Sequence, residues 1–333
     1  MITKLLDRGL VPDFLIQNGI RRLLRQRLAE IAGTDLHAFK NSMKHSTLAV
    51  ETQAANQQHY EVPTEFYDAC LGARKKYSSC YFIDGNTTLD QAEEAMLQIS
   101  CDRAQLSDGQ KILELGCGWG AITLWMAEKY PGSEITAVSN SKTQKIYIDD
   151  MAAKRNLKNI TVITADINQF VTDKKFDRVM SVEMFEHVRN HEQLFSKISS
   201  WLEPAGKLFF HIFCHREKPY FFENQGDGDW MTKHFFAGGL MPSWSLPLMF
   251  QDDLTIQNYW KVCGTQYEQT SLAWLENLDR NKSLALSALK HHPDGANVMF
   301  QRWRIFFLAC AETFGFKRGG EWFVGHYLFS KRQ

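Results

Sequence analysis

The amino-acid sequence predicts an α/β protein with a doubly wound, Rossmann-like sheet, and three observations support this prediction. From residue 111 onward, strand-like apolar runs alternate with helical patterns, which is typical of a mostly parallel sheet. The run 112–115 ends in glycines at three alternate positions, as expected where a strand turns tightly into a helix. Residues 206–213 and 322–330 fit the antiparallel edge of such a sheet.

The individual elements follow from hydrophobic periodicity. The first 50 residues show helical spacing of leucine and isoleucine. A further helix, over about 88–104, begins with a capping box formed by Thr88 and Gln91. The strands expected in the core are 111–115, 134–138, 160–164, 176–182, 206–213 and 323–330. The helices expected between them are 120–130, 141–155, 190–203 and 298–314.

A chain of 333 residues is longer than one ordinary domain, so additions to the core are expected. The stretch between the last two predicted strands is rich in Trp, Phe and Pro and is too long for a simple loop. The predicted division is an N-terminal helical extension at 1–58, a Rossmann-like core at 59–214, a helical cap over the active site at 215–297, and a C-terminal helix and strands completing the core at 298–333.

Composition argues against several classes of function. Lys+Arg and Asp+Glu are both 38, so net charge gives no reason to expect a nucleic-acid partner. No stretch approaches the ~20 apolar residues of a membrane span, and no signal-peptide pattern opens the chain. The seven cysteines are scattered without zinc-ligand spacing, so we expect reduced thiols and no metal. Together these features favour a cytoplasmic protein without stable membrane association.

One basic segment has two interpretations. Residues 21–27 are amphipathic, which suits either a helix on a membrane surface or a helix packed on the main domain with its arginines in solvent. The packed helix is favoured, because acidic residues follow closely and no large aromatic side chain anchors the apolar face.

The glycine turn predicts the cofactor. Gly116, Gly118 and Gly120 have G-x-G-x-G spacing, whereas a dinucleotide site requires G-x-G-x-x-G with an acidic residue about 20 positions later. Here the acidic residue, Glu114, precedes the glycines. This pattern, with the unpaired N–H groups of the following helix, suits S-adenosylmethionine, a nucleoside with a charged amino-acid tail.

Polar residues also follow the next two strands, and the carboxyl ends of parallel strands meet at one edge of a sheet. Asn140 and Gln144 follow the second strand and are expected to bind the ribose hydroxyls, since no carboxylate is present there. Asp166 and Ile167 follow the third strand and are expected to bind the adenine amine and to cover the adenine face.

The most informative residues follow the strand 176–182. Glu183, Glu186 and His187 would place two carboxylates and an imidazole beside the cofactor's sulfonium, where their burial is costly without a function. A structural alternative is that acidic residues favour the start of a helix. That alternative accounts for one glutamate but not for Glu-x-x-Glu-His, so we expect these residues to be catalytic.

These motifs resemble those of the cyclopropane fatty-acid synthase superfamily of S-adenosylmethionine-dependent enzymes, and within it those of the coclaurine N-methyltransferase group. The similarity covers nearly the whole chain from about residue 59 and extends more loosely over the N-terminal helices. The stretches that carry it are 60–63, 77–82, 89–102, 113–120, 139–144, 184–187, 229–230, 250–253 and 321–322.

The resemblance implies a class I methyltransferase fold, and it adds Tyr77 and Ser78 to the S-adenosylmethionine site. It also implies that the partner is a small-molecule amine, with a homodimer as one option for the assembly. The residues that it places at the substrate site are Tyr60, Glu61, His211, Trp230, Trp303 and Phe306. His211 departs from the pattern, because the alkaloid enzymes have a glutamate at this position.

We therefore predict methyl transfer from S-adenosylmethionine to a secondary or tertiary amine, such as a benzylisoquinoline-like alkaloid amine. In this hypothesis Glu183 and Glu186 attract the cation, while His187 accepts its proton because a histidine pKa is expected near the working pH. The aromatic side chains at the substrate site would add cation–π attraction.

Two alternatives are weighed against this prediction. Cyclopropane fatty-acyl-phospholipid synthases resemble the chain at Glu186, Cys80 and His211, which in them help to hold a bicarbonate base. They also require a tyrosine on the C-terminal helix, where this chain has none, and typically carry a small residue in place of Glu183. The second alternative is a non-catalytic S-adenosylmethionine-binding protein. The intact glycine turn beside an intact Glu-x-x-Glu-His argues against it.

Overall fold

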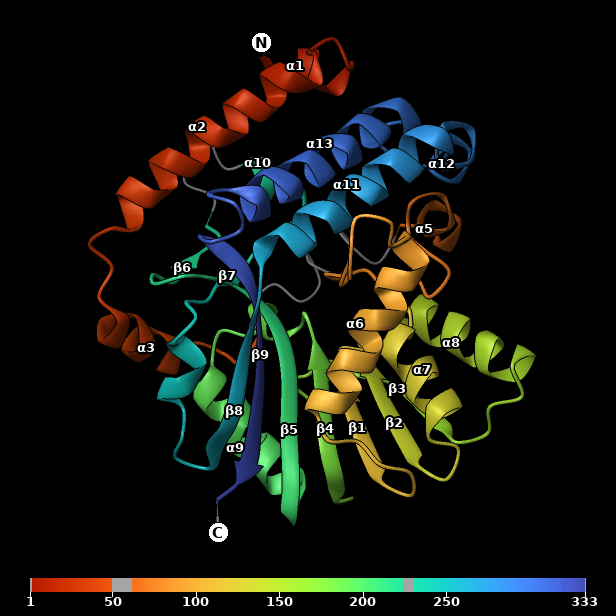
Figure 1. Cartoon of the computed structure of the whole chain (residues 1–333), viewed down its shortest axis with the longest axis vertical. Helices are drawn as coiled ribbons and strands as arrows, with labels where there is room; N and C mark the ends of the chain where they lie inside the picture. Colours follow the sequence, from red (N-terminus) through yellow and green to blue (C-terminus); the bar gives the residue numbers. More distant parts are fainter. Residues whose placement is uncertain (1, 50–61, 224–229, 333) are drawn as a thin grey trace.

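A seven-stranded sheet forms the centre of the computed structural model, which describes residues 2–49, 62–223 and 230–332 (Figure 1). The strand order is β3-β2-β1-β4-β5-β9-β8, and β9 runs antiparallel to both of its neighbours. The strands are β1 (Lys111–Leu115), β2 (Glu134–Ser139), β3 (Ile160–Thr164), β4 (Phe176–Val182), β5 (Leu202–His215), β8 (Leu254–Val262) and β9 (Trp322–Lys331). This arrangement confirms the predicted α/β fold class.

Helices cover both faces of the sheet because successive strand residues point to opposite sides. On β1, Ile112 packs with α6 and α7, whereas Leu113 packs with α9. The helices are α1 (Ile2–Asp7), α2 (Asp13–Ile31), α3 (Leu36–Lys44), α5 (Thr64–Cys70), α6 (Leu89–Arg103), α7 (Ala121–Lys129), α8 (Lys142–Lys154), α9 (His191–Trp201), α10 (Trp230–His234), α11 (Gly264–Arg280), α12 (Lys282–Ala288) and α13 (Ala296–Gly315). Two short 3-10 helices are η1 (Phe185–His187) and η2 (Leu246–Met249).

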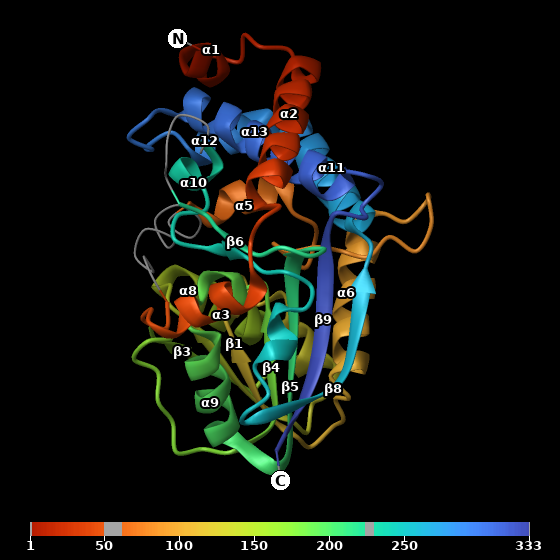
Figure 2. The same cartoon turned by 90° about the vertical axis from the view of Figure 1, so that its left-hand side faces the viewer.

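A layer of helices lies over one end of the sheet (Figures 1 and 2). The helices α11, α12 and α13 lie together there, with α5 beside them. Tyr267 of α11 bonds to Glu183, which directly follows β4, so this layer faces the carboxyl ends of the parallel strands. The predicted cap, 215–297, contributes α11 and α12 to this layer, whereas α5 and nearly all of α13 lie outside that range.

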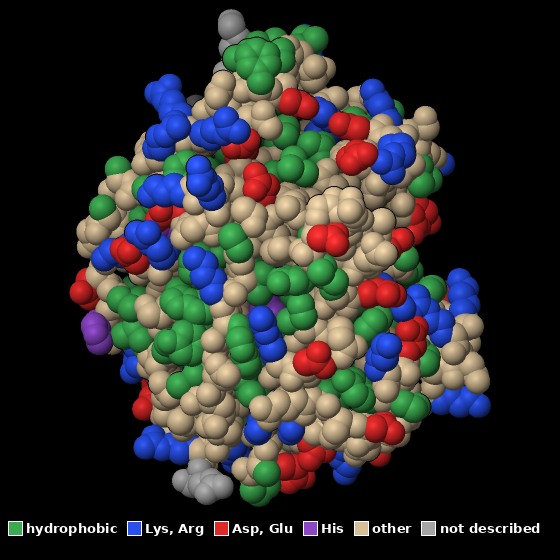
Figure 3. Space-filling view, viewed as in Figure 1, with side chains coloured by type: hydrophobic (Ala, Val, Ile, Leu, Met, Phe, Trp, Pro, Cys, Tyr) green, Lys and Arg blue, Asp and Glu red, His purple; other side chains and the backbone are tan. Residues whose placement is uncertain are grey.

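The basic helix α2 packs on α13, as the favoured interpretation predicted. Its apolar residues Ile16, Ile20, Leu24 and Leu28 pack against the buried cluster that contains α13. Arg21 donates two hydrogen bonds to the Glu312 carboxylate, at 2.5 and 2.9 Å. Lys and Arg side chains gather over α2 at the upper left of Figure 3, facing solvent. Within the described ranges, none of the helices combines the length and the apolar character needed to cross a bilayer.

Strand β8 was absent from the sequence prediction. It lies in the stretch 215–297, which therefore supplies a strand to the sheet as well as the expected helices. Only Leu254 and Val262, the two end residues of β8, are fully buried. A register irregularity between Ile256 and Asn258 further breaks the alternation, so the sequence shows little of the period that identifies a strand. The predicted division of the chain into segments stays a prediction.

Candidate active site

The glycines of the turn between β1 and α7 let neighbouring side chains pack closely against the backbone. All three glycines have positive φ, at 79° for Gly116, 52° for Gly118 and 76° for Gly120. A Cβ on Gly116 would lie 2.6 Å from the Met184 side chain, and one on Gly120 would lie 2.7 Å from Ile148. A Cβ on Gly118 would meet nothing within 4 Å. Gly116 and Gly120 therefore serve packing, while Gly118 borders open space.

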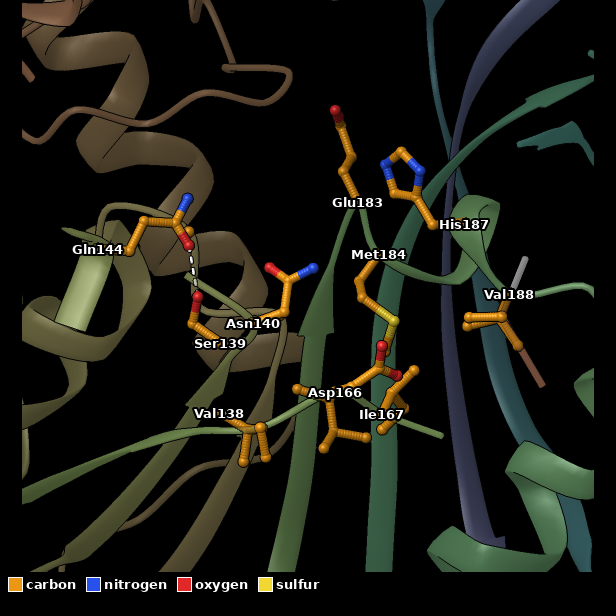
Figure 4. A pocket seen from close by; sticks show the side chains of 15 residues that line it. Val138, Ser139, Asn140, Gln144, Asp166, Ile167, Glu183, Met184, His187 and Val188 are labelled. Carbon is orange, nitrogen blue, oxygen red and sulfur yellow. Dashed lines mark hydrogen bonds between the residues drawn. The ribbon is translucent and has the colours of Figure 1, made fainter. Parts of the chain in front are cut away.

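Two adjoining cavities meet at this turn, and Gly116, Gly118 and Glu183 line both. The first cavity, shown in Figure 4, is also lined by Ala49, Leu115, Val138, Ser139, Asn140, Gln144, Ala165, Asp166, Ile167, Met184, His187 and Val188. The second is also lined by Lys75, Lys76, Tyr77, Ser78, Leu97, Ser100, Glu114, Cys117, Trp119, Ala121, Ile122 and Val182. An elongated ligand with two chemically different ends can therefore lie across the turn, with its middle at Glu183.

The first cavity carries groups that suit a nucleoside. Gln144 is held by a hydrogen bond from the Ser139 hydroxyl to its Oε1, at 2.6 Å (Figure 4). Its buried Nε2 has no hydrogen-bond partner among the described residues, which leaves two N–H donors for a ligand. Asn140, Asp166 and Ile167 line the same cavity, as predicted from the strand ends.

The second cavity carries groups that suit an amino-acid tail. Glu114 is buried and accepts a 2.5 Å hydrogen bond from Thr123, and burial raises its pKa to about 7. Lys76 is also buried, and it donates to the Ser78 hydroxyl and the Ser79 carbonyl, both at 2.6 Å. The sequence prediction named Tyr77 and Ser78 but missed Lys76, because a lysine in a polar stretch gives no sign of burial. Its ammonium provides a positive charge beside the cavity.

Glu183 stands where the two cavities meet and is held from three sides. Its Oε1 accepts hydrogen bonds from the Ser79 N–H at 2.9 Å and from His211 Nε2 at 3.1 Å. Its Oε2 accepts a 2.7 Å bond from the Tyr267 hydroxyl. The backbone φ of Glu183 is 46°, a strained value for a residue with a side chain, and such strain concentrates at functional sites.

Glu186, in contrast to Glu183, has no hydrogen bond from the described residues to its carboxyl group. It is 1% exposed. Burial and the nearby charge of Glu183 raise its pKa well above the usual range. Burial also raises the pKa of Glu183, but Lys76 and the donors Ser79 and Tyr267 oppose that rise. Of the two carboxyl groups, Glu186 therefore keeps its proton to the higher pH.

His187 lies beside Glu183 at the upper end of the cavity in Figure 4. The sequence hypothesis placed its pKa near the working pH. Burial instead lowers the pKa to about 4, although the charge of Glu183 acts in the other direction. His187 is therefore neutral at neutral pH and a weaker base than expected.

The predicted aromatic residues form one connected wall. The ring of Trp303 lies 6.3 Å from that of Tyr77, which lines the second cavity, and 5.0 Å from that of Phe235. Phe235 stacks on Phe306 at 4.4 Å and contacts Trp230 at 5.5 Å. Trp303, Phe306 and Trp230 thus belong to an apolar cluster that reaches the second cavity at Tyr77, and none of the three lines either cavity itself.

Some predicted residues lie elsewhere. Gly120 and Glu186 do not line either cavity: Gly120 directly precedes α7, and Glu186 lies buried in η1. His211 lies behind Glu183, to which it bonds, rather than on a cavity wall. Tyr60 and Glu61 fall outside the described residues, so their assignment stays a prediction.

Comparison with known proteins identifies the family. The family model for mycolic acid cyclopropane synthetase matches residues 48–319. The (S)-coclaurine N-methyltransferase of Thalictrum flavum subsp. glaucum is 39% identical over 99% of this chain and 95% of its own. The enzyme of the same name from Papaver somniferum is 37% identical over 98% and 97% of the two chains. This chain belongs to the coclaurine N-methyltransferase family.

A solved structure agrees with this assignment. The crystal structure of coclaurine N-methyltransferase bound to N-methylheliamine and S-adenosylhomocysteine matches with a TM-score of 0.95, at 38% identity and 99% coverage of both chains. The cyclopropane-fatty-acyl-phospholipid synthase of Escherichia coli K12 is more distant, at 27% identity over 78% of this chain and 63% of its own. The predicted class I methyltransferase fold and the S-adenosylmethionine cofactor are confirmed, and the chain is an S-adenosylmethionine-dependent N-methyltransferase.

Substitution of Gly118 by valine is expected to abolish binding of S-adenosylhomocysteine, measured by calorimetric titration. The added side chain would fill open space where the two cavities meet. Gly109→Val is the matched control, because Gly109 also has positive φ and an open Cβ position but lies outside both cavities. Equal affinity in the two variants would place the cofactor elsewhere.

Substitution of Gln144 by alanine is expected to weaken S-adenosylhomocysteine binding by about 1–2 kcal/mol, because a hydrogen bond to the ligand is lost. Turnover at saturating S-adenosylmethionine should change little, since Gln144 lies at the nucleoside end. A comparison of the dissociation constant with kcat separates the two effects. A fall in kcat with unchanged affinity would contradict this assignment.

Proposed function

We propose that this protein methylates the nitrogen of an aromatic secondary or tertiary amine of the benzylisoquinoline type, with Glu183, Glu186 and His187 as its catalytic residues. The observation that supports this proposal most directly is the buried carboxyl group of Glu186, which has no hydrogen-bond partner among the described residues, near the hydrogen-bonded carboxyl group of Glu183. A cationic amine satisfies such a site, whereas a neutral lipid chain does not. The substrates named for the relatives, coclaurine among them, are of this chemical class.

The nitrogen must have a free lone pair before it can react, and an amine at neutral pH is mostly protonated. Bound S-adenosylmethionine supplies an electrophilic methyl group. In its ionised form Glu186 accepts the amine's proton, because its raised pKa makes it a stronger base than an ordinary glutamate and the transfer leaves a neutral acid beside a neutral amine. Glu183 stays ionised and stabilises the positive charge on the nitrogen.

His187 contributes as a neutral imidazole, because burial lowers its pKa to about 4. Its ring contacts Phe236 at a centroid distance of 4.8 Å, which orients it beside the site. We assign it the role of positioning the amine rather than that of the main proton acceptor.

The aromatic wall supports the choice of substrate class. Trp303 is fully buried, and Phe306 is nearly so. The ring of Phe235, just after α10, packs against both, and Trp230 of α10 packs against Phe235. Aromatic faces attract a cationic nitrogen by about 0.5–2 kcal/mol where water is excluded. They also accept the rings of an aromatic amine by stacking or edge contacts.

Two further features complete the proposal. Burial raises the pKa of the thiols of Cys70, Cys80, Cys101, Cys117 and Cys214, and unreactive free thiols agree with a cytoplasmic location. The partner that we propose is the small-molecule amine, and not a nucleic acid. The chain acts either alone or as a homodimer with a second copy.

Incubation with S-adenosylmethionine and a substrate panel tests the proposed reaction. Coclaurine and other secondary and tertiary tetrahydroisoquinolines should yield N-methylated products detected by mass spectrometry. Vesicles of unsaturated phospholipid, with and without bicarbonate, form the comparison arm. Modified phospholipid without any methylated amine would overturn the proposal in favour of the lipid-modifying alternative.

The Glu186→Gln variant tests the proton acceptor. At pH 7 it should lower kcat/KM for coclaurine by roughly 10²-fold, because its amide cannot accept the proton. Raising the pH should restore much of the rate, since free amine becomes more abundant. In the wild type, activity should fall as the pH drops through the raised pKa of Glu186.

The comparison variant is His187→Ala. It should lose less activity, about tenfold, and keep the wild-type shape of its pH–rate profile, because the imidazole is neutral throughout this range. A larger loss in His187→Ala than in Glu186→Gln, with rescue at high pH, would return the role of base to His187.

A further inference from the structure

A row of two buried histidines and one half-buried arginine reaches Glu183 from residues that do not line the cavities. Arg103 Nη1 lies 2.9 Å from His326 Nδ1, and His326 Nε2 lies 3.0 Å from His211 Nδ1. His211 Nε2 then bonds to Glu183 Oε1 at 3.1 Å. His211 and His326 are 1% and 0% exposed, and neither they nor Arg103 line the cofactor cavities.

The direction of these hydrogen bonds is fixed at the arginine end. A guanidinium only donates, so His326 Nδ1 must accept and its proton must be on Nε2. His326 Nε2–H then donates to His211 Nδ1, which leaves the proton of His211 on Nε2. Burial and the nearby positive charges of Lys76 and Arg103 lower the pKa of both histidines well below the usual range, which agrees with neutral rings.

We infer that Arg103, His326 and His211 are positioning residues that hold Glu183 as a hydrogen-bond-accepting carboxylate for the methyl-transfer reaction. This inference rests on the proposed role of Glu183. With the arginine at its far end, the row presents only a donor to Glu183 Oε1. If Glu183 instead donated a proton to His211, the reversed row would place a His326 N–H against a guanidinium N–H.

The row does not conduct protons. Arg103 cannot release a proton at any working pH, and each neutral ring already carries its proton on the side of Glu183. The row therefore contributes orientation and fixed dipoles, which act where charge develops without needing to reorganise.

The backbone of Glu183 is also held by β5, the strand that carries His211. Its N–H donates to the His211 carbonyl at 2.8 Å, next to the β4–β5 pairing of Val182 with His211. His211 thus holds both the main chain and the side chain of a residue whose φ of 46° is strained. With Ser79 and Tyr267, it completes three donors on one carboxylate.

Arg103→Met tests the row at the residue farthest from the reaction. Methionine can keep the contact with Trp260, over which the guanidinium lies at 5.1 Å, but it offers no donor to His326. With coclaurine as substrate, kcat should fall about tenfold, because a carboxylate with weakened hydrogen bonds is less well fixed. The affinity for S-adenosylhomocysteine, measured by calorimetry, should stay unchanged.

Arg178→Met is the matched control. Arg178 of β4 is also half-buried, and its side chain donates to the carbonyls of Ala104 and Gln105 just after α6, both at 3.0 Å; no hydrogen bond joins it to either histidine. Its kcat should stay within about twofold of the wild-type value, as expected away from the site. An equal fall of kcat in both arginine variants would overturn the proposal, because loss of packing at α6 would then explain the effect.

His326 allows a rescue comparison. A glutamine there can accept from Arg103 through its oxygen and donate to His211 through its nitrogen, whereas a leucine can do neither. We expect kcat of His326→Gln to exceed that of His326→Leu by about tenfold. Equal values in two folded variants would contradict a role in hydrogen bonding.

Nitrogen-15 NMR of the histidine rings provides a readout independent of activity. In the wild-type protein with S-adenosylhomocysteine, His211 and His326 should both be neutral with the proton on Nε2. In Arg103→Met the two rings should no longer be fixed in this one tautomer, because the donor to His326 Nδ1 is gone. A wild-type protein that shows these tautomers but does not methylate coclaurine would refute the proposed function and leave the row intact. Protonated rings or the opposite tautomers would refute the row itself.

Discussion

The active site depends on the burial of two carboxyl groups side by side in one turn. A carboxylate loses its hydration on burial, and a second negative charge nearby adds to that cost. The two carboxyl groups are stabilised to different extents: Glu183 receives three hydrogen bonds, while Glu186 receives none from the described residues. Because the environments differ, the two groups bind a proton with different strengths, and two chemically similar side chains acquire separate roles.

The fold brings distant segments together to produce this difference. The donors to Glu183 come from Ser79 before α6, from His211 on β5 and from Tyr267 on α11. The β4–β5 pairing sets the backbone position, and α11 of the helical layer closes the site from above. Trp303 and Phe306 of the aromatic wall lie on α13 of the same layer, so this layer brings both a hydrogen bond to the carboxylate and aromatic rings to this end of the sheet.

The sequence predicted those parts of the site that are encoded locally. The glycine turn, Asn140, Gln144 and Asp166 each follow a strand with a clear apolar pattern, so their convergence follows from parallel topology. The row behind Glu183 could not be predicted, because His211 and His326 are 115 positions apart and Arg103 and His326 are 223 apart. His326 looks like an ordinary interior residue of a strand until β5 and β9 are paired in register. The pKa of His187 was misjudged for a related reason: burial by other segments sets it, and the motif alone does not show that burial.

The unpartnered state of Glu186 also bears on substrate binding. A buried carboxyl group without a hydrogen bond destabilises the folded protein by about 1–3 kcal/mol, and the rest of the fold must compensate for this cost. A cationic amine that reaches Glu186 relieves it, so part of the binding free energy comes from correcting a defect in the free protein. A neutral analogue of the same shape would leave the carboxyl group unsatisfied. The site therefore discriminates by charge, for the same reason that Glu183 and Glu186 have separate roles: one carboxyl group is hydrogen-bonded by the described residues and the other is not.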